Sequence, residues 1–361
     1  MRLPERARVA PLAVAAGAVL VAAVVAGALL RAGGYDPVLA ARALVGGAVG
    51  SPSALLSVTF VRAVPLILTG LAVALAFRAG VWNIGAEGQL YAGAVAAVWV
   101  GLRGGALPAW LLVPAVIAAA AAAGAVWALV PALMKLRLGV GEVITTLLMN
   151  FVGIHLAAYA VHGPLQEGRG VFPQTDAIAV AARLPMLVPG TRLHVGFAAA
   201  VLVALALWMF LRHTCLGFQI RAVGASAEAA RVAGRIDARR IVLIAFLGSG
   251  AVAGVAGGME VAGVTHALYE NLSPGWGYTA IAVALLAGLH PVAVLGTGLL
   301  FGALEGGAGA MQRVAGVPSA WVTAVEALII LSVLALDRLG RGGLLAVAGL
   351  AEPQTPEPRV V

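Results

Sequence analysis

Two stripes of polar side chains interrupt stretches of the sequence that are otherwise apolar. In each stripe the polar residues are four positions apart, and the stripes are Asn83–Glu87–Tyr91 and Glu142–Thr146–Asn150. Residues four apart lie on one face of a helix, so each stripe would make one helix face polar. Such side chains can line the path of a polar solute, or they can hold helices together through hydrogen bonds worth about 0.6 kcal/mol each. We interpret both stripes as candidate linings of a translocation path, with helix–helix bonding as the alternative.

Three further acids lie in or beside apolar runs, at Glu260, Glu305 and Glu326. A charged residue at the centre of a membrane helix costs about 2.5–3.5 kcal/mol on insertion scales, so such acids normally face a bundle interior or water. For these three, hydrogen bonding between helices is the favoured interpretation. Intramembrane acids also suggest a proton relay or a cation channel. Against this, the sequence has no Asp pair and no His–Glu pair inside an apolar run.

The composition indicates the environment in which these residues lie. Hydrophobic residues make up 62% of the 361 residues and charged residues only 11%, whereas a soluble domain carries about 25% charge. The single cysteine excludes a disulfide framework. Lysine occurs only at Lys135, so the chain has no GxxxxGK[ST] loop for binding a nucleotide. These features predict an all-α polytopic membrane protein that cannot hydrolyse ATP through such a loop.

About 20 apolar residues cross a bilayer as a helix. Runs of this kind predict ten spans, at about 9–30, 54–77, 84–102, 108–133, 140–161, 193–211, 241–262, 277–289, 291–311 and 319–337. The third begins in a glycine-rich stretch and is a candidate for a broken or re-entrant helix, and the eighth is short. Glycines repeat at four-residue spacing in two of the runs and predict close helix packing. They are Gly250, Gly254 and Gly258, and Gly298, Gly302 and Gly306.

The positive charges predict the orientation of the spans. With the N-terminus inside and ten alternating spans, 15 of the 23 Lys and Arg residues fall on the cytoplasmic side and seven outside, while Arg62 lies within a span. This distribution follows the positive-inside rule and predicts N-in and C-in. The first run is too long for a typical secretory signal and is expected to remain as an anchor. We expect one transmembrane domain over 1–345 and a disordered cytoplasmic tail over 346–361.

Three hydrophilic segments connect the predicted spans. Segments 31–52 and 162–192 would be extracytoplasmic, and the four prolines of the second predict an extended or turn-rich structure. Segment 212–240 would be cytoplasmic. Within it, Ser226 can cap a short helix at about 227–233 with Glu228 in its first turn, and Gly234 can end that helix in a left-handed conformation. Such a helix could transmit a push from a soluble partner, or the segment could be an ordinary basic loop.

Four ordered motifs resemble a known family. PLILTGLAVALAFRAGVWNIGAEGQLYAG covers 65–93 and contains NIGAEGQ at 83–89, the most specific element, and GVGEVITTLLMNFV, RAVGASAEAARVAG and GWGYTAIAVALLAGLHP start at residues 139, 221 and 275. Together they resemble the permeases of ABC importers in the branched-chain amino acid and simple sugar class, closest to the nucleoside branch. The similarity covers most of the chain after residue 50. Arg235 departs from the pattern, because this branch tends to carry an apolar residue there.

The resemblance implies a set of partners. They are an ATPase that holds ATP and Mg, a second permease chain that is related to this one or identical with it, and an extracytoplasmic substrate-binding protein. It also implies that 221–235 is the coupling helix seated in a groove of the ATPase, with Arg221, Gly224, Ser226, Glu228, Arg231 and Gly234 as its candidate contacts. The membrane would be the cytoplasmic membrane of a prokaryote. Spans 2–5 and 7–10 would form an inverted repeat, with substrate passing between the halves.

The resemblance therefore implies a permease subunit that is not an enzyme, binds no cofactor itself and moves substrate inward by alternating access. A nucleoside is the first expectation for the substrate, followed by a simple sugar and a branched-chain amino acid. The rival from a different class is a secondary transporter that couples protons or cations through Glu87 and Glu142. An enzyme acting on lipid-linked substrates ranks last, because the histidines have no metal-ligand spacing.

Overall fold

The computed structural model describes residues 20–21, 23–234, 236–318, 320–321, 323–324, 327–328 and 331–332. These residues belong to two compact units, Ala43–Ala310 and a smaller one drawn from Met1–Arg42 and Met311–Val361. Most of the predicted spans 9–30 and 319–337 lies outside the described residues. Glu326, Arg235 and the expected tail at 346–361 also lie outside them. The functional argument therefore rests on the larger unit.

The described residues are mostly helical and contain no strand beyond two isolated bridges. The α-helices in chain order are α2 (Pro37–Val49), α3 (Pro52–Ala54), α4 (Phe60–Arg78), α5 (Ala86–Arg103), α6 (Ala109–Leu138), α7 (Glu142–His162), α8 (Gly196–His213), α9 (Cys215–Ala225), α10 (Ala227–Gly234), α11 (Ala238–Glu260), α12 (Trp276–Leu286) and α13 (Pro291–Ala315). Two π-helical turns are η1 (Leu55–Thr59) and η3 (Val261–Thr265), and η2 (Val180–Ala182) is a 3₁₀ turn. Segment 31–52 therefore contains a helix, α2.

Within the part of the chain that the structure describes, six helical stretches are long and apolar enough to cross a membrane, and each coincides with a predicted span. Their bounds are Pro52–Arg78, Ala109–Leu138, Glu142–His162, Gly196–His213, Ala238–Thr265 and Pro291–Ala315. The expectation of an all-α polytopic membrane protein is confirmed. Helix α4 is the central element, because every residue from Ala63 to Ala76 is buried. A helix that is apolar on all sides lies either among other helices or in lipid, and neighbouring helices cover this stretch of α4.

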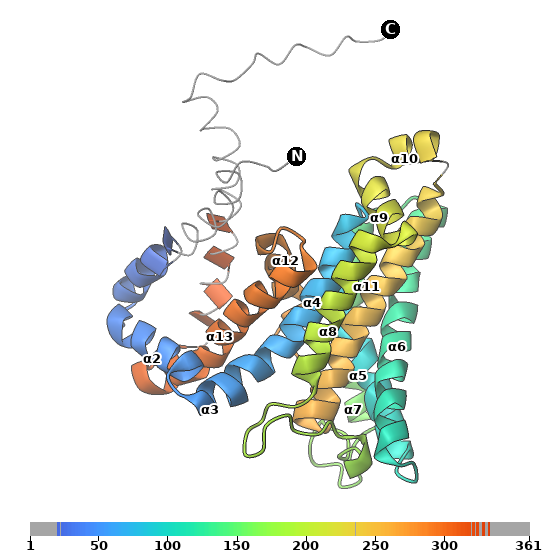
Figure 1. The fold of residues 1–361 in the computed structure, drawn as a ribbon. Helices are drawn as coiled ribbons and strands as arrows, with labels where there is room; N and C mark the ends of the chain where they lie inside the picture. Colours follow the sequence, from blue (N-terminus) through green and yellow to red (C-terminus); the bar gives the residue numbers. More distant parts are fainter. Residues whose placement is uncertain are drawn as a thin grey trace, which may run out of the picture. The chain divides into compact units, whose positions relative to one another are not determined.

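Glycines allow the helices around α4 to approach one another closely. A side chain at Gly254 of α11 would overlap the backbone of Ala120 in α6, and Gly93 of α5 contacts the backbone of Gly254. On α13, a Cβ at Gly302 would lie 2.8 Å from the backbone nitrogen of Ala63 in α4. Both predicted glycine repeats are therefore packing surfaces, as expected. They bring α5, α6 and α11 together on one side and α4 and α13 on the other (Figure 1).

Two helices begin after irregular backbone, and one of them is too short to span a bilayer. Residues 81–85 are non-helical before α5, which agrees with the expected break in the third span. Helix α12 has 11 residues and follows the irregular segment 266–275. At 1.5 Å per residue it is about 16 Å long, roughly half of a hydrocarbon core. The expected short eighth span is therefore a half-length helix.

A layer of irregular chain covers one end of the unit. It consists of 163–195 and 266–275, and is called the loop layer below (lower end in Figure 1). Thr175 N donates to Leu268 O at 3.0 Å, and Ile178 N donates to His266 O at 2.8 Å, so the two segments are bonded to each other. The extended and turn-rich structure predicted for 162–192 is confirmed.

The opposite end of α8 leads into two short helices (upper end in Figure 1). Ser226 Oγ accepts a hydrogen bond from Ala229 N at 3.2 Å, which confirms the predicted N-cap of α10. The predicted end is wrong: Gly234 is still helical and its φ is not left-handed. Helix α9 was not predicted. Thr214 caps it by accepting from Gly217 N at 3.0 Å, so the expected single helix over 221–235 is two helices divided at Ser226.

Candidate functional site: a polar joint between two broken helices

The NIGAEGQ segment forms a closed hydrogen-bond network at the start of α5. Asn83 Oδ1 accepts from Gly85 N at 3.0 Å and from Gln89 Nε2 at 3.1 Å. Asn83 Nδ2 donates to Gln89 Oε1 at 3.2 Å and to Ser249 Oγ of α11 at 2.9 Å. Asn83 is fully buried and both ends of its amide are satisfied. The side chain therefore replaces the helical bonds that the irregular backbone of 81–85 lacks.

Helix α7 supplies two further side chains to the same backbone. Asn150 Oδ1 accepts from Gly88 N at 2.8 Å, and its Nδ2 donates to Ile84 O at 2.8 Å. Thr146 Oγ1 accepts from Ile84 N at 3.2 Å. Both residues are fully buried. The two stripes thus meet, and in the bonds described here Thr146 and Asn150 hold backbone groups of the α5 start.

Glu87 and Tyr91 connect the start of α5 to the start of α12. Glu87 Oε2 accepts from Gly277 N at 2.6 Å, and Tyr91 OH accepts from Ser273 N at 3.2 Å. A carboxyl group at a helix N-terminus receives otherwise unpaired N–H groups and interacts favourably with the helix dipole. Gly277 has to be glycine, because a Cβ there would lie 2.5 Å from the Cα of Glu87. The starts of two broken helices are therefore in direct contact.

Glu142 is the predicted path residue that the structure separates from the others. Its Oε1 lies 2.6 Å from Lys135 Nζ, across the turn between α6 and α7. Both side chains are partly exposed. Helical spacing correctly put Glu142 four residues before Thr146, but its position at the first turn of α7 directs it to a neighbouring basic residue outside the joint.

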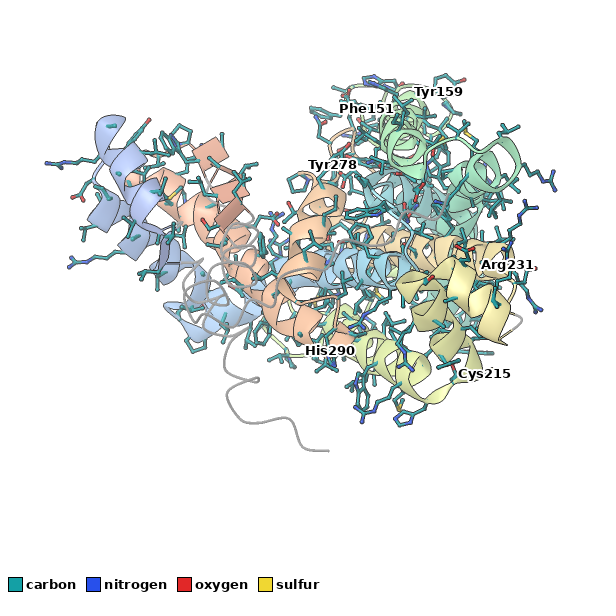
Figure 2. The ribbon with its side chains drawn as sticks, turned by 90° about the horizontal axis from the view of Figure 1, so that it is seen from above. Phe151, Tyr159, Cys215, Arg231, Tyr278 and His290 are labelled. Atoms are coloured by element: carbon teal, nitrogen blue, oxygen red, sulfur yellow. The ribbon has the colours of Figure 1, made fainter. Side chains whose placement is uncertain are left out.

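The predicted coupling residues occupy both short helices. Arg221 and Gly224 lie on α9, while Glu228, Arg231 and Gly234 lie on α10 and Ser226 caps it. Figure 2 looks onto this end and labels Cys215 at the start of α9 and Arg231 on α10.

Arg78, at the end of α4, was not singled out from the sequence, yet it connects three elements. Gly224 of α9 lies so close to α4 that a side chain there would overlap the carbonyl group of Arg78. Arg78 Nε donates to Leu289 O at 3.0 Å and its Nη2 lies 3.5 Å from Gly288 O, just beyond α12. A basic residue in the last turn of a span was the only signal in the sequence.

Residues 55–334 match the family model described as "Branched-chain amino acid transport system / permease component". The chain belongs to this permease family. The match covers most of the chain and includes all six predicted path residues and all six predicted coupling residues, so the joint and the α9–α10 segment are parts of a permease.

Named relatives are similar over nearly their whole lengths. A glucose ABC transporter permease protein of Haloferax volcanii is 40% identical over 87% of this chain and 84% of its own. A guanosine ABC transporter permease protein of Bacillus subtilis is 39% identical over 74% and 78%, respectively. A nucleoside ABC transporter permease protein of Lactococcus lactis is 30% identical over 84% and 85%. No solved structure shows a significant match to this permease.

The loop layer of the permease contains a buried histidine with a strongly lowered pKa. His194 is 1% exposed, and its Nδ1 accepts from Gly196 N at 3.1 Å. Burial lowers the pKa of His194 to about 4, with smaller contributions from His266 and Arg192. Burial also lowers the pKa of His266, beside Arg183. Both rings are therefore neutral at pH 7, and protonation of His194 would place a charge inside the layer.

Proposed function

We propose that this permease is the membrane subunit of an ATP-driven ABC importer for nucleosides. Two of the three relatives described above are named for guanosine or nucleosides, and the NIGAEGQ segment gave the same expectation. The relative named for glucose makes a hexose the second candidate. The importer would reside in the cytoplasmic membrane of a prokaryote, with both chain ends and the α9–α10 segment on the cytoplasmic side.

The geometry supports different roles for the two ends of the permease, the α9–α10 segment and the loop layer. The α9–α10 segment would dock on a separate ATPase that carries ATP and Mg, and the loop layer would receive a substrate-binding protein. The contact of Gly224 with Arg78, and of Arg78 with the carbonyl groups after α12, offers a route by which movement of α9 reaches α12. At its other end α12 is held by Glu87. A second permease chain, related or identical, would complete the path.

The observation that carries the proposal is the series of contacts from α9 through Arg78 to α12 and Glu87. A proton- or cation-coupled transporter would use Glu87 or Glu142 as its titrating group. In the structure Glu87 accepts from the Gly277 backbone and Glu142 is paired with Lys135, so both have structural partners. The α9–α10 segment, by contrast, forms two capped helices that contact α4.

The test is purification of the tagged permease from its native membrane in mild detergent, with mass spectrometry of the chains that accompany it. An ATPase, a second permease chain and ATP-dependent uptake of guanosine into proteoliposomes are the expected results. A permease that purifies without any ATPase, and whose uptake follows a proton gradient, would instead establish the secondary transporter. Uptake of D-glucose without guanosine would keep the importer and change its substrate.

A further inference from the structure

Four charged residues from four elements lie near one another as a cluster in the larger unit, beside the start of α12. They are Arg62 of α4, Arg192 of the loop layer, Glu260 at the end of α11 and Glu305 of α13. Arg62 Nη1 lies 3.0 Å from Glu305 Oε1, and Glu260 interacts electrostatically with the other three residues. Arg62 and Glu305 form an ion pair of opposite charges, with Arg192 and Glu260 as a second basic and a second acidic residue beside it. Sequence reasoning had assigned Glu260 and Glu305 to helix bonding and gave Arg62 no role.

The cluster is fixed in orientation by its neighbours. Glu305 Oε2 accepts from Trp276 Nε1 at 2.8 Å, and Trp276 is almost completely buried at the start of α12. Arg192 N donates to Ser57 Oγ in η1 at 3.1 Å, which ties the loop layer to the chain just before Arg62. The carboxyl group of Glu305 is therefore held between one indole and one guanidinium group.

Exposure distinguishes this cluster from the joint. The side chain of Arg62 is 48% exposed and that of Glu305 is 20% exposed, although both lie in helices long enough to span a membrane. A half-exposed guanidinium group within a span faces a water-filled space, because facing lipid costs several kcal/mol. Asn83, Thr146 and Asn150, in contrast, are fully buried. Of these polar side chains, those of Arg62 and Glu305 are the ones that reach the surface.

The backbone is irregular on both sides of the same place. The π-helical turn η1 ends three residues before Arg62, and η3 begins directly after Glu260. A π-helical turn inserts an extra residue into a helix and occurs frequently at functional sites. Two such turns from helices far apart in the sequence flank one group of charges.

We propose that Arg62 and Glu305, with Glu260 and Arg192 beside them, form a substrate-contact site in the translocation path for a neutral molecule with neighbouring hydroxyl groups. Guanidinium groups only donate hydrogen bonds and carboxylates only accept them, so a pair of hydroxyls satisfies both at once. The Arg62–Glu305 ion pair has no net charge, so it favours neither cations nor anions. The ribose of a nucleoside and a free hexose share this chemistry. The class of substrate rests on the proposed importer function, whereas the water-facing position of Arg62 does not.

Accessibility is tested with the single native cysteine removed. In Cys215→Ser membranes, Arg62→Cys is treated with a charged methanethiosulfonate reagent that does not enter lipid. We expect Cys-labelling at least tenfold faster than for Leu202→Cys on α8, whose side chain is 66% exposed on an apolar helix. Equal, negligible labelling at both positions would overturn the water-facing site, whatever the transporter class.

The ligand is tested by uptake of matched pairs, guanosine with 2′-deoxyguanosine and methyl glucoside with methyl 3-deoxyglucoside, so that each deoxy partner lacks neighbouring hydroxyl groups. Glu305→Gln keeps an acceptor for Trp276 Nε1 but loses a strong acceptor for hydroxyls. We expect at least a tenfold loss of uptake for the hydroxylated member and less than a threefold loss for its deoxy partner. The pair that shows this difference identifies the source of the hydroxyls.

One control variant and one comparison of substrates distinguish a contact role of Glu305 from a structural role. Arg137→Gln removes an exposed charge at the end of α6 and should leave both members of each pair unchanged. Equal losses for hydroxylated and deoxy substrates in Glu305→Gln would overturn the contact site and leave a structural ion pair. Absence of ATP-dependent uptake of all four compounds by the unaltered complex would contradict the proposed function instead, and the labelling experiment would still judge the site.

Discussion

Glu87 shows how one carboxyl group can organise irregular backbone inside a membrane protein. It lies in the first turn of α5 and accepts from the first turn of α12 through Gly277 N. In lipid no water is available to satisfy free N–H groups, so a side chain that does so stabilises both helix starts. At the residue scale, the polar groups of the joint act mainly on the backbone.

Glu87→Ala should destabilise the permease by about 2–4 kcal/mol, because it leaves Gly277 N–H unpaired and creates a cavity. Glu87→Gln keeps an acceptor and should lose only about 1 kcal/mol. The measurement is thermal unfolding in detergent. Glu142→Gln is the comparison, since its partly exposed pair should contribute less than about 1 kcal/mol. A Glu87→Ala protein as stable as the unaltered one would contradict a stabilising role of Glu87.

His194 makes the stability of the loop layer dependent on pH. Its pKa is about 4 in the folded protein, below the ordinary value of 6.5, so the unfolded state binds more protons between these values. Stability is therefore full above pH 6.5 and falls as the pH falls towards 4. At pH 5 the loss is about 2 kcal/mol.

Thermal unfolding at pH 7 and pH 5 measures this effect. The decrease in melting temperature between the two pH values should be clearly smaller in His194→Gln. His213→Gln, which changes an exposed histidine at the end of α8, should keep the whole decrease. The same decrease in all three proteins would assign the pH dependence to other groups.

At the element scale, α12 is held at both ends by residues of other helices. Glu87 holds its first turn, and Arg78 contacts the carbonyl groups of Gly288 and Leu289 beyond its last turn. Gly288 and Leu289 both have left-handed φ angles, which lets the chain reverse before α13. Because α12 is short, displacement of Arg78 by α9 would move the helix as one rigid piece.

Gly224→Ala tests this connection, because the added methyl group would overlap the carbonyl of Arg78 and push α9 away from α4. We expect uptake to fall at least tenfold while the ATPase partner still hydrolyses ATP. Ser226→Ala removes the N-cap of α10, which lowers stability by about 1 kcal/mol, and should reduce uptake much less. Equal coupling of hydrolysis to uptake in Gly224→Ala and the unaltered complex would contradict the connection.

At the scale of the whole molecule, the larger unit depends on close backbone contact between α5, α6 and α11. Without a hydrophobic driving force between helices in lipid, van der Waals packing of small residues provides much of the association. Gly93, Gly124 and Gly254 each lie against the backbone of a neighbouring helix.

Gly254→Ala should destabilise the permease by about 3 kcal/mol, because the methyl group overlaps the Ala120 backbone and separates α11 from α6. Gly296→Ala is the matched change, since it lies in α13 with open space around it. It should be neutral or stabilise by up to about 1 kcal/mol. Melting temperatures in one detergent compare the two, and equal effects would show that the glycine contacts do not limit packing.

The sequence alone determined the class of protein, the positions of the described spans, the glycine packing surfaces and the cap at Ser226. These features depend on composition and on residues near one another in the chain, so local rules are sufficient to find them. The four-residue spacing also identified five residues of the joint, because residues of one helix face point in one direction.

Only the tertiary structure decided what those residues contact. Spacing cannot show that Asn150 bonds to Ile84 O, or that Glu87 bonds to the start of a helix 190 positions later. Nor can it show that Arg62 meets Glu305 across 243 positions, while Glu142 turns to Lys135 nearby. Whether a polar residue in an apolar run bonds to backbone or faces water depends on its neighbours from distant segments, and these are set by how the helices pack.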